Sequence, residues 1–303
     1  MSNQNNKLII NNNAIQKIDV QTNVLNKLLD KSNDRIAKEL LDKAKDCWKK
    51  KDYETATECY EKALNLKPNY IEALNNYGLF HRIKTNNYKY AIELYTRVIE
   101  LDPKDFGVFH RRSACKERLK DYNGAIEDAF LHIENTKKPS ADDYISVALI
   151  KFRIEDFEGS IKHCTEATNV NAKSDFAYYI RGKAKFSMRN FKDACEDFKK
   201  SIEIIIESNK DNNTNEKFGV GKLKYYGKSK FEMQEYKTAM KLFKKIILEF
   251  PNHHSAYELI ANCYEKLNDY ENYKINIDKF NTLNEIHLKK MEVIALSKQR
   301  NEE

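Results

Sequence analysis

Histidine and cysteine, the residue types that most often act as metal ligands or nucleophiles, stand side by side at His163-Cys164. A second histidine pair, His253-His254, lies in a polar stretch between two apolar helical patterns. Cys164 occupies an apolar position of its pattern, so packing explains it without a metal or a nucleophilic role. The sequence contains neither the phosphate-binding pattern Gly-x-x-x-x-Gly-Lys-Ser/Thr nor the zinc-binding pattern His-Glu-x-x-His. It therefore predicts no catalytic residue, no cofactor and no metal site.

Charge is nearly balanced along the 303-residue chain, where 53 Lys and Arg face 46 Asp and Glu for a formal net charge of +7. This small excess permits an acidic partner and argues against nucleic acid, which stays an alternative. We find no signal segment and no apolar run near the roughly 18 residues of a membrane span. The six cysteines are dispersed without a Cys-x-x-Cys pair, as expected of free thiols in a reducing compartment. We expect a cytoplasmic protein without a membrane segment.

A polar residue followed by an aromatic one recurs seven times at nearly constant spacing. The steps between the aromatics are 35, 34, 35, 34, 45 and 34 residues. In six of the seven units a small side chain comes three residues later, and another small one stands nine or ten residues earlier. Between these marks apolar residues recur at three and four, the period of a helix. The aromatics are Tyr53, Tyr88, Tyr122, Phe157, Phe191, Tyr236 and Tyr270.

Each unit is therefore predicted to be a helix, a short turn and a second helix. The polar residue before the aromatic, in most units Asp or Asn, can cap the second helix by accepting a backbone N–H hydrogen bond. The small residues let the two helices approach closely, so a large side chain at Gly182 would overpack their crossing. In the second unit Gly78 stands ten residues before Tyr88 instead of nine, which indicates a one-residue insertion.

Segments 178–186 and 191–194, Tyr-Tyr-Ile-Arg-Gly-Lys-Ala-Lys-Phe and Phe-Lys-Asp-Ala, show this frame most clearly and resemble the tetratricopeptide repeat. The resemblance covers about residues 37–287. It implies an all-α fold, a right-handed superhelical α-solenoid of seven helix-turn-helix repeats. In that family the first helices line a concave groove that takes an extended peptide or a helix of another protein. The repeats are expected to start near residues 37, 71, 106, 141, 175, 220 and 254.

Three segments fall outside this regular frame. Residues 1–34 form an Asn- and Lys-rich leader, expected to be partly disordered with one short helix. Within the array of residues 35–287, residues 207–219 are expected to form a polar loop between repeats five and six. Residues 288–303 are expected to form a C-terminal capping helix and tail.

The positions that face the groove in this family carry mostly basic and amide side chains here. Aromatic residues such as Trp48 and Phe152 stand beside them, which suits an acidic partner segment with bulky anchors. The alternative explanation is that solvated Lys and Arg line any helical surface. The predicted groove residues are Lys45, Asn75, Asn76, Arg82, His110, Arg111, Arg118, Arg153, Tyr179, Lys183, Lys224 and Lys228.

Co-chaperones built of this repeat grip the acidic C-terminal tail of heat-shock chaperones with a carboxylate clamp of Lys, Asn and Arg side chains. Asn76 and Arg111 match that clamp and Lys45 keeps a donor, whereas Leu41 and Gly107 have no side-chain donor. Each lost charge-assisted hydrogen bond removes about 1.5–3 kcal/mol, so the clamp is degraded. We therefore expect a non-catalytic scaffold for protein–protein interaction, with a co-chaperone for a heat-shock chaperone as the alternative.

Overall fold

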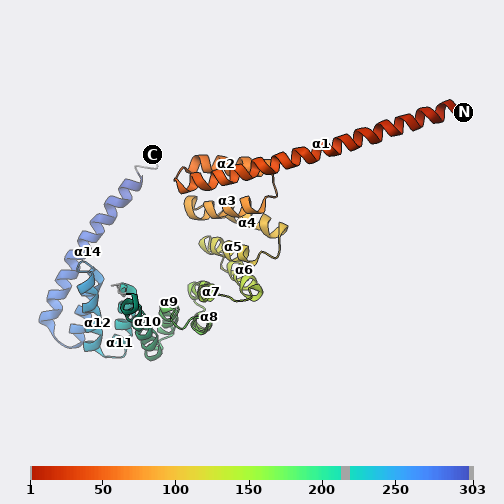
Figure 1. Ribbon diagram of the computed structural model, residues 1–303. Helices are drawn as coiled ribbons and strands as arrows, with labels where there is room; N and C mark the ends of the chain where they lie inside the picture. Colours follow the sequence, from red (N-terminus) through yellow and green to blue (C-terminus); the bar gives the residue numbers. More distant parts are fainter. Residues whose placement is uncertain (1, 213–218, 300–303) are drawn as a thin grey trace. The chain divides into compact units, whose positions relative to one another are not determined.

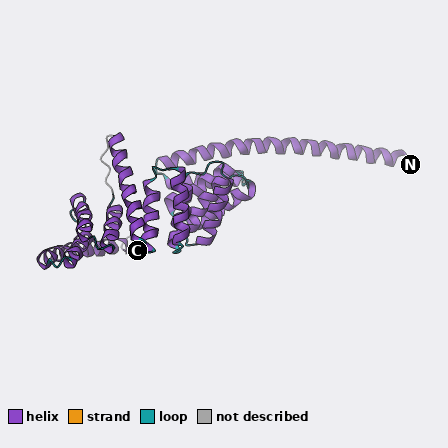
Figure 2. Cartoon of the chain, turned by 90° about the horizontal axis from the view of Figure 1, so that it is seen from below, coloured by secondary structure: helices purple, strands orange, loops and turns teal. Residues whose placement is uncertain are grey.

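The computed structural model describes residues 2–212 and 219–299, and the side chains of 22–211, 219–295 and 297. Over this part of the chain the structure is helical with short turns and no strand (Figure 2), which confirms the all-α prediction. The helices, most of them labelled in Figure 1, are α1 (Ser2–Lys49), α2 (Tyr53–Leu66), α3 (Ile71–Phe80), the π-helix η1 (His81–Thr85), α4 (Tyr88–Leu101), α5 (Phe106–Arg118), α6 (Tyr122–Asn135), α7 (Ala141–Arg153), α8 (Phe157–Val170), α9 (Asp175–Ser187), α10 (Phe191–Asn212), α11 (Val220–Glu232), α12 (Tyr236–Glu249), α13 (His254–Lys266) and α14 (Tyr270–Gln299).

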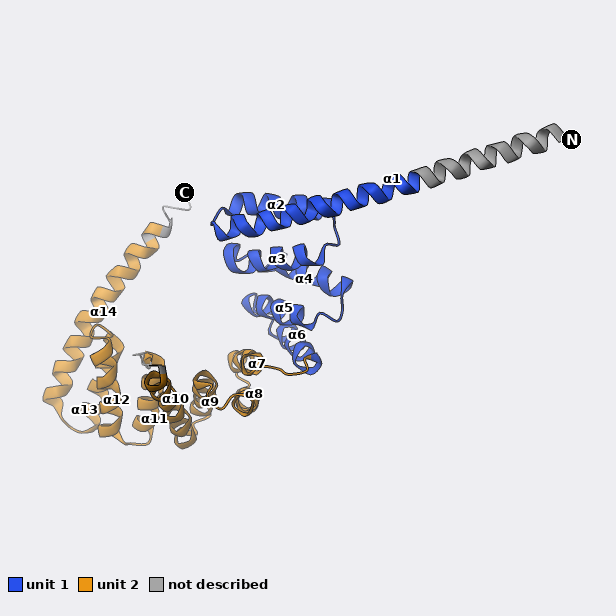
Figure 3. Ribbon diagram, in the orientation of Figure 1, with its two compact units in different colours: residues 1–135 blue, residues 136–303 orange. Residues whose placement is uncertain are grey.

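The chain folds into two compact units (Figure 3). Unit 1 comprises Met1–Asn135 with α1 to α6, and unit 2 comprises Thr136–Glu303 with α7 to α14. Within each unit every odd-numbered helix packs against the even-numbered helix that follows it. The fourteen α-helices thus form seven helical hairpins, in agreement with the seven repeats predicted from the sequence.

Every hairpin turn is built the same way, from one residue in the left-handed region followed by the polar residue before the second helix. In repeat four Glu155 has a φ of 62°, and Oδ1 of Asp156 accepts a hydrogen bond from Gly159 N at 2.8 Å. The predicted caps are confirmed at Asp52, Asn87, Asp121, Asp156, Asn190 and Asp269, whereas Glu235 makes no side-chain cap. The left-handed residues are Lys51, Asn86, Lys120, Glu155, Arg189, Gln234 and Asn268, none of them glycine.

Small residues of the first helices lie directly against aromatic rings of the second helices. A Cβ atom added to Gly182 would lie 2.8 Å from Cε1 of Phe198, and one added to Gly78 would lie 2.7 Å from Cε1 of Tyr95. Both rings are fully buried. The close crossing predicted at Gly182 is therefore present, because the glycine leaves the space that the ring fills.

An aromatic cluster forms the core of the first two repeats. The rings of Tyr60 and Tyr77 stack with centroids 4.9 Å apart, and Phe80 packs against both. Burial raises the pKa of Tyr60 to about 12. Phe80 also makes edge contacts with Trp48 and Tyr53, with ring centroids 5.8 and 6.0 Å away. Trp48 and Tyr53 thus each pack against the buried ring of Phe80.

The one-residue insertion of repeat two is absorbed as the π-helical turn η1. Here Asn87 N donates to the carbonyl of His81 at 3.1 Å, and Thr85 Oγ1 lies 2.9 Å from Nδ1 of the same histidine. A π-helical turn accommodates an extra residue within a helix. Helix α4 consequently begins in the same way as the other second helices, with Asn87 as its cap.

The N-terminal segment differs from the prediction of a partly disordered leader with a separate short helix. Helix α1 runs from Ser2 through Lys49 without a break, since neither Gly nor Pro interrupts it. The side chains of Val24, Leu25 and Leu28 are exposed and do not pack against the first repeat.

The insertion between repeats five and six also begins later than predicted. Helix α10 continues through 207–212 to Asn212, because that polar stretch holds no helix-breaking residue. The rest of the predicted loop, 213–218, lies outside the described residues. Gly219, with a φ of 76°, precedes α11.

The predicted C-terminal capping helix is the continuation of the last repeat. Helix α14 runs from Tyr270 to Gln299 without a break, so residues 288–299 extend the second helix of repeat seven, and the tail beyond them lies outside the described residues. Although α1 and α14 are 48 and 30 residues long, no helix in the described ranges is apolar enough over a sufficient length to span a membrane.

The six cysteines are free thiols, five of them buried and Cys47 half-buried, as their apolar positions predicted. Burial raises the pKa of Cys164 and of Cys263 to about 12. These thiols are therefore protonated at neutral pH and act as packing groups. Burial lowers the pKa of His163, the neighbour of Cys164, which favours the neutral imidazole.

Candidate functional site

An aromatic pocket of unit 1 opens over Trp48 of α1 and Tyr53 of α2. Its volume is about 510 Å³. Four lysines surround the two rings, Lys84 among them with Nζ 5.6 Å from the centre of the Tyr53 ring. An apolar floor with a cationic rim suits a bulky side chain flanked by carboxylates. The lining residues are Lys45, Trp48, Lys49, Lys51, Tyr53, Asn76 and Lys84, which we call the Trp48 pocket.

A second pocket of about 440 Å³ lies on the other side of α3 and shares Asn76 with the first. Its charged residues are two carboxylates, Glu72 and Asp105, and one guanidinium, Arg111. The surface along α1, α3 and α5 is therefore hollowed twice, with lysines at one end and a carboxylate excess at the other. The lining residues are Ile71, Glu72, Asn75, Asn76, Leu79, Asp105 and Arg111, which we call the Glu72 pocket.

The predicted clamp residues already have partners within unit 1. Lys45 Nζ lies 2.6 Å from Oε1 of Glu72, and Asn76 Nδ2 donates to the Glu72 carbonyl at 2.7 Å. Arg111 Nη1 donates to Oδ1 of Asn75 at 3.0 Å. An incoming carboxylate would have to displace Glu72 from Lys45, which further weakens the resemblance to a carboxylate clamp.

Arg82 and Arg118 line a separate pocket of about 340 Å³ between η1 and α5, together with Glu117 and Tyr88. Arg82 belongs to the π-helical turn and Arg118 ends α5. The structure thus groups these two predicted residues with each other, in a pocket whose lining shares no residue with the Trp48 and Glu72 pockets.

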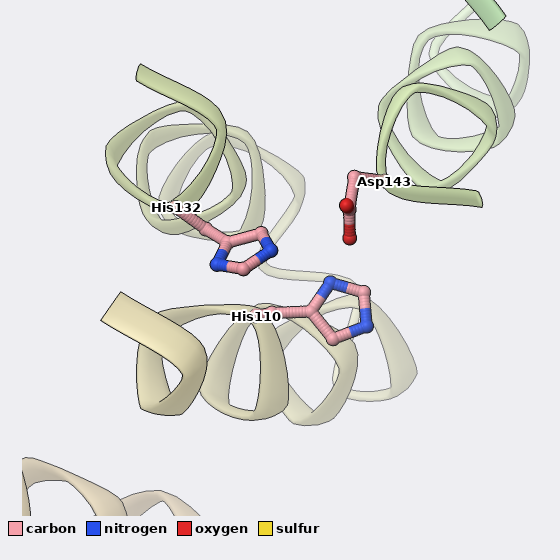
Figure 4. A group of neighbouring side chains, drawn as sticks. All are labelled: His110, His132 and Asp143. Carbon is pink, nitrogen blue, oxygen red and sulfur yellow. The ribbon is translucent and has the colours of Figure 1, made fainter. Parts of the chain in front are cut away.

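His110, another predicted groove residue, faces His132 of α6 (Figure 4), with ring centroids 5.2 Å apart. His132 is anchored in turn, since its Nδ1 lies 2.9 Å from the carbonyl of Phe106. Asp143, also labelled in Figure 4, belongs to unit 2, where it forms a capping box with Ser140 at the start of α7. The two histidines therefore form part of the contact between α5 and α6.

In unit 2 the predicted residue Lys183 is enclosed by aromatic rings. Its Nζ lies 4.5, 5.8 and 5.5 Å from the ring centres of Phe152, Tyr179 and Tyr225. Burial, and then the neighbouring charge of Arg153, lower the pKa of Lys183. An ammonium group over ring faces is stabilised by the ring electrons, so these residues form one cation–aromatic cluster on α7, α9 and α11.

Lys224 and Lys228 lie one turn apart on α11. Burial, and then the charge of Lys228, lower the pKa of Lys224, although Glu258 acts in the opposite direction. A half-buried ammonium with a lowered pKa gains from any added anion nearby. In unit 2 the predicted groove cations are thus concentrated on α9 and α11.

The structure gathers Lys45 and Asn76 in one pocket and adds residues from outside the predicted groove positions. Lys51, Tyr53 and Lys84 lie in a turn, at the start of a second helix and in η1, whereas the repeat pattern assigns groove positions to first helices. The sequence does carry a signal near Lys84, since this residue lies between Gly78 and Tyr88, where the spacing indicates the one-residue insertion.

The fold defines the class of this protein, which is an all-α repeat protein of stacked helical hairpins. Matches to the family described as tetratricopeptide repeat cover residues 71–105, 177–205 and 225–253, and a match described as TPR repeat covers 45–83. The chain therefore contains tetratricopeptide repeats. Proteins of this fold bind other proteins and are in general non-catalytic scaffolds.

Two curated relatives are also named for this repeat. Human tetratricopeptide repeat protein 6 is 24% identical over 149 residues, which cover 48% of this chain and 28% of the relative. TPR repeat-containing protein MJ1428 of Methanocaldococcus jannaschii is 22% identical over 153 residues, covering 48% of this chain and 26% of the relative. The chain thus spans about a quarter of the length of the curated relatives it matches.

Solved structures show the same fold at low sequence identity. A tetratricopeptide repeat protein from Parabacteroides merdae aligns with a TM-score of 0.60 and 17% identity, over 82% of this chain and 93% of that one. YrrB, described as a TPR protein with an unusual peptide-binding site, aligns with a TM-score of 0.51 and 14% identity, over 66% of this chain and 96% of that one. At this identity the similarity supports the fold alone.

Proposed function

We propose that this protein is a non-catalytic scaffold whose first helices bind an extended, acidic segment of another protein. The observation that carries the proposal is the Trp48 pocket, where two aromatic rings are surrounded by four lysines. Lys45 is paired with Glu72 and Asp42, whereas the partner of Lys49, Asp46, is exposed and 3.7 Å away, and Lys84 lies over a ring. A bulky side chain with carboxylates beside it complements this pocket in shape and charge.

Unit 2 offers a second surface of the same chemistry. Lys183 among its three rings, with Lys224 and Lys228, combines cations and aromatics as the Trp48 pocket does. The lowered pKa of Lys183 and Lys224 means that a partner carboxylate would stabilise the charged forms of both. One partner chain with two acidic stretches, or two partners, would match these surfaces.

The alternative of a co-chaperone receives less support from the geometry. Lys45 is paired with Glu72, and Asn76 and Arg111 already have partners. A chaperone tail would therefore have to rely on the lysines of the Trp48 pocket instead of a clamp.

Selection of peptides from a displayed library of random 12-residue sequences on the full chain tests the proposal. We expect enrichment of Asp and Glu next to Trp, Phe or Tyr, and loss of that enrichment with the double variant Lys49→Glu/Lys84→Glu. The matched control is Lys89→Glu/Lys104→Glu, which makes the same change of charge outside the Trp48 and Glu72 pockets. Selected peptides without acidic residues, or enrichment kept by the pocket variant, would overturn the assignment.

The same protein preparations separate the alternatives. An acidic chaperone tail peptide that competes with the selected peptides would support the co-chaperone function. Tight binding of a single-stranded oligonucleotide that falls steeply with salt and is not displaced by the peptides would instead point to nucleic acid.

A further inference from the structure

The two pockets of unit 1 that flank α3 are lined by opposite charges. Four lysines line the Trp48 pocket on one side of α3, and Glu72 and Asp105 line the next pocket on the other side. Asn76 lies on the wall that the two pockets share. A segment that lies along both pockets therefore meets opposite charges at its two ends.

Glu72 is the residue that creates this change. Its Oε1 lies 2.6 Å from Lys45 Nζ, and its Oε2 lies 3.5 Å from the hydroxyl of Tyr70. The pair neutralises Lys45, so the cationic rim of the Trp48 pocket is formed chiefly by Lys51, Lys84 and Lys49, whose partner Asp46 is exposed and 3.7 Å away. A partner carboxylate placed next to Glu72 would meet a like charge.

Asp105 extends the negative end. It is half-buried at the start of α5, its carboxylate makes no capping hydrogen bond there, and no basic side chain in the described ranges pairs with it. Arg111, the one cation of this pocket, donates to Asn75. A cationic side chain in this pocket would gain two carboxylate neighbours.

We infer that the partner segment is bipolar: an aromatic side chain flanked by carboxylates binds in the Trp48 pocket, and a Lys or Arg further along the segment binds between Glu72 and Asp105. Neighbouring helices pack about 8–10 Å apart, and an extended chain advances about 3.3 Å per residue. The cation therefore follows or precedes the aromatic anchor by about three residues. This inference rests on the proposed function and adds to it the charge pattern and direction of the segment.

Fluorescence polarisation with three synthetic peptides tests the inference. All three carry Trp between two Glu residues, and at the third residue on both sides of the Trp they carry Arg, Gln or Glu. With the full chain we expect the Arg peptide to bind about tenfold more tightly than the Glu peptide, with the Gln peptide between them. Peptides with Arg on one side only then give the direction.

The double variant Glu72→Gln/Asp105→Asn should reduce this tenfold preference to about one, chiefly by tightening the Glu peptide, because Lys45 then loses its closest carboxylate and keeps only Asp42 at 3.8 Å. The control Glu93→Gln/Glu100→Gln removes two exposed carboxylates of α4 and should keep the preference. Thermal melts of both variants establish that they are folded.

The outcomes distinguish failure of the bipolar segment from failure of the proposed function. Equal binding of the Arg and Glu peptides to the unchanged chain, or a preference that survives in Glu72→Gln/Asp105→Asn, would overturn the bipolar segment alone. Failure of all three peptides to bind would overturn the proposed function together with it.

Discussion

Arg112 of α5 and Asp128 of α6 are joined by two parallel hydrogen bonds, Nε to Oδ2 at 2.8 Å and Nη2 to Oδ1 at 2.7 Å. Arg112 Nη1 also donates to Thr96 of the preceding repeat at 3.1 Å, and Lys116 lies 2.9 Å from the same carboxylate. Asp128 is only 3% exposed. One buried carboxylate thus joins both helices of repeat three and, through the guanidinium, repeat two.

Removing this carboxylate should cost unit 1 a large part of its stability. In Asp128→Ala two cations lose their shared partner, and breaking a buried pair on one side costs about 3–5 kcal/mol. Trp48, the only tryptophan, lies in unit 1, so urea unfolding followed by its fluorescence reports this change. Asp46→Ala, at an exposed pair, should leave the transition within about 0.5 kcal/mol. A shift no larger than that of the control would refute the linking role of Asp128.

An equivalent arrangement recurs in unit 2, where Arg181 bonds to Asp197 and reaches Thr165, and Lys185 lies 2.8 Å from the carboxylate. Asp197→Ala should therefore cause a comparable loss. It should appear in the helical signal at 222 nm more strongly than in Trp48 fluorescence, because these residues lie in the other unit. A larger change in fluorescence than in helicity would contradict this assignment.

Gly182→Val should destabilise unit 2 by about 1–3 kcal/mol, since the added atoms meet the ring of Phe198. The loss should be smaller in combination with Phe198→Leu than the sum of the two single changes, because the smaller side chain vacates the contact. Thermal or urea unfolding of the four proteins of this double-mutant cycle gives the coupling. Additive effects would show that the contact is not what limits residue 182.

Glu155→Gly should stabilise the chain by about 0.5–1 kcal/mol. A non-glycine residue in the left-handed region costs about 1–2 kcal/mol, part of which the greater freedom of glycine in the unfolded chain cancels. Asn268→Gly should change stability less, since asparagine tolerates that region. Differential scanning calorimetry checks both, and a destabilised Glu155→Gly would contradict the expected relief.

Unit 1 should lose stability as the pH falls from about 7 towards 5. Burial lowers the pKa of His81, against a smaller opposing effect of Glu61, so the unfolded chain takes up a proton more readily than the folded one. The stability that His81 contributes is complete above the unfolded pKa near 6.5 and decreases below it. In His81→Gln this part of the pH dependence should disappear from Trp48-monitored unfolding. The exposed His287→Gln serves as the control, and an unchanged profile in both variants would exclude His81 as the cause.

The periodic parts of the fold could be predicted because each repeat carries a polar residue, an aromatic residue and small residues at nearly the same spacing. Asp156 caps a helix and Gly182 makes room for a ring wherever they occur in the frame, so the seven hairpins follow from the pattern. Helix ends outside the frame could not be located in this way. No Gly or Pro separates residues 1–34 from α1, and polarity alone does not end a helix.

The candidate site was predictable only in part. Lys45 and Asn76 occupy groove positions of the repeat, with Trp48 beside them, so the repeat pattern predicts all three. That Lys45 is neutralised by Glu72 depends on a contact between residues 27 apart, which helical periodicity does not reveal. Lys51 and Lys84 reach the Trp48 pocket from a turn and from η1, outside the positions that the repeat pattern assigns to the groove.

The π-helical turn η1 has a consequence for how a repeat surface can change. An added residue in a regular α-helix rotates everything after it by about 100°, which would turn the apolar face of the next segment away from its neighbour. Because a single widened turn takes up the extra residue, α4 of repeat two starts at the same position of the hairpin as the other second helices. The cost is confined to five residues, His81–Thr85, and two of these, Arg82 and Lys84, line two different pockets. A change in length at this position thus alters what the surface can recognise while the stacking of the hairpins is preserved.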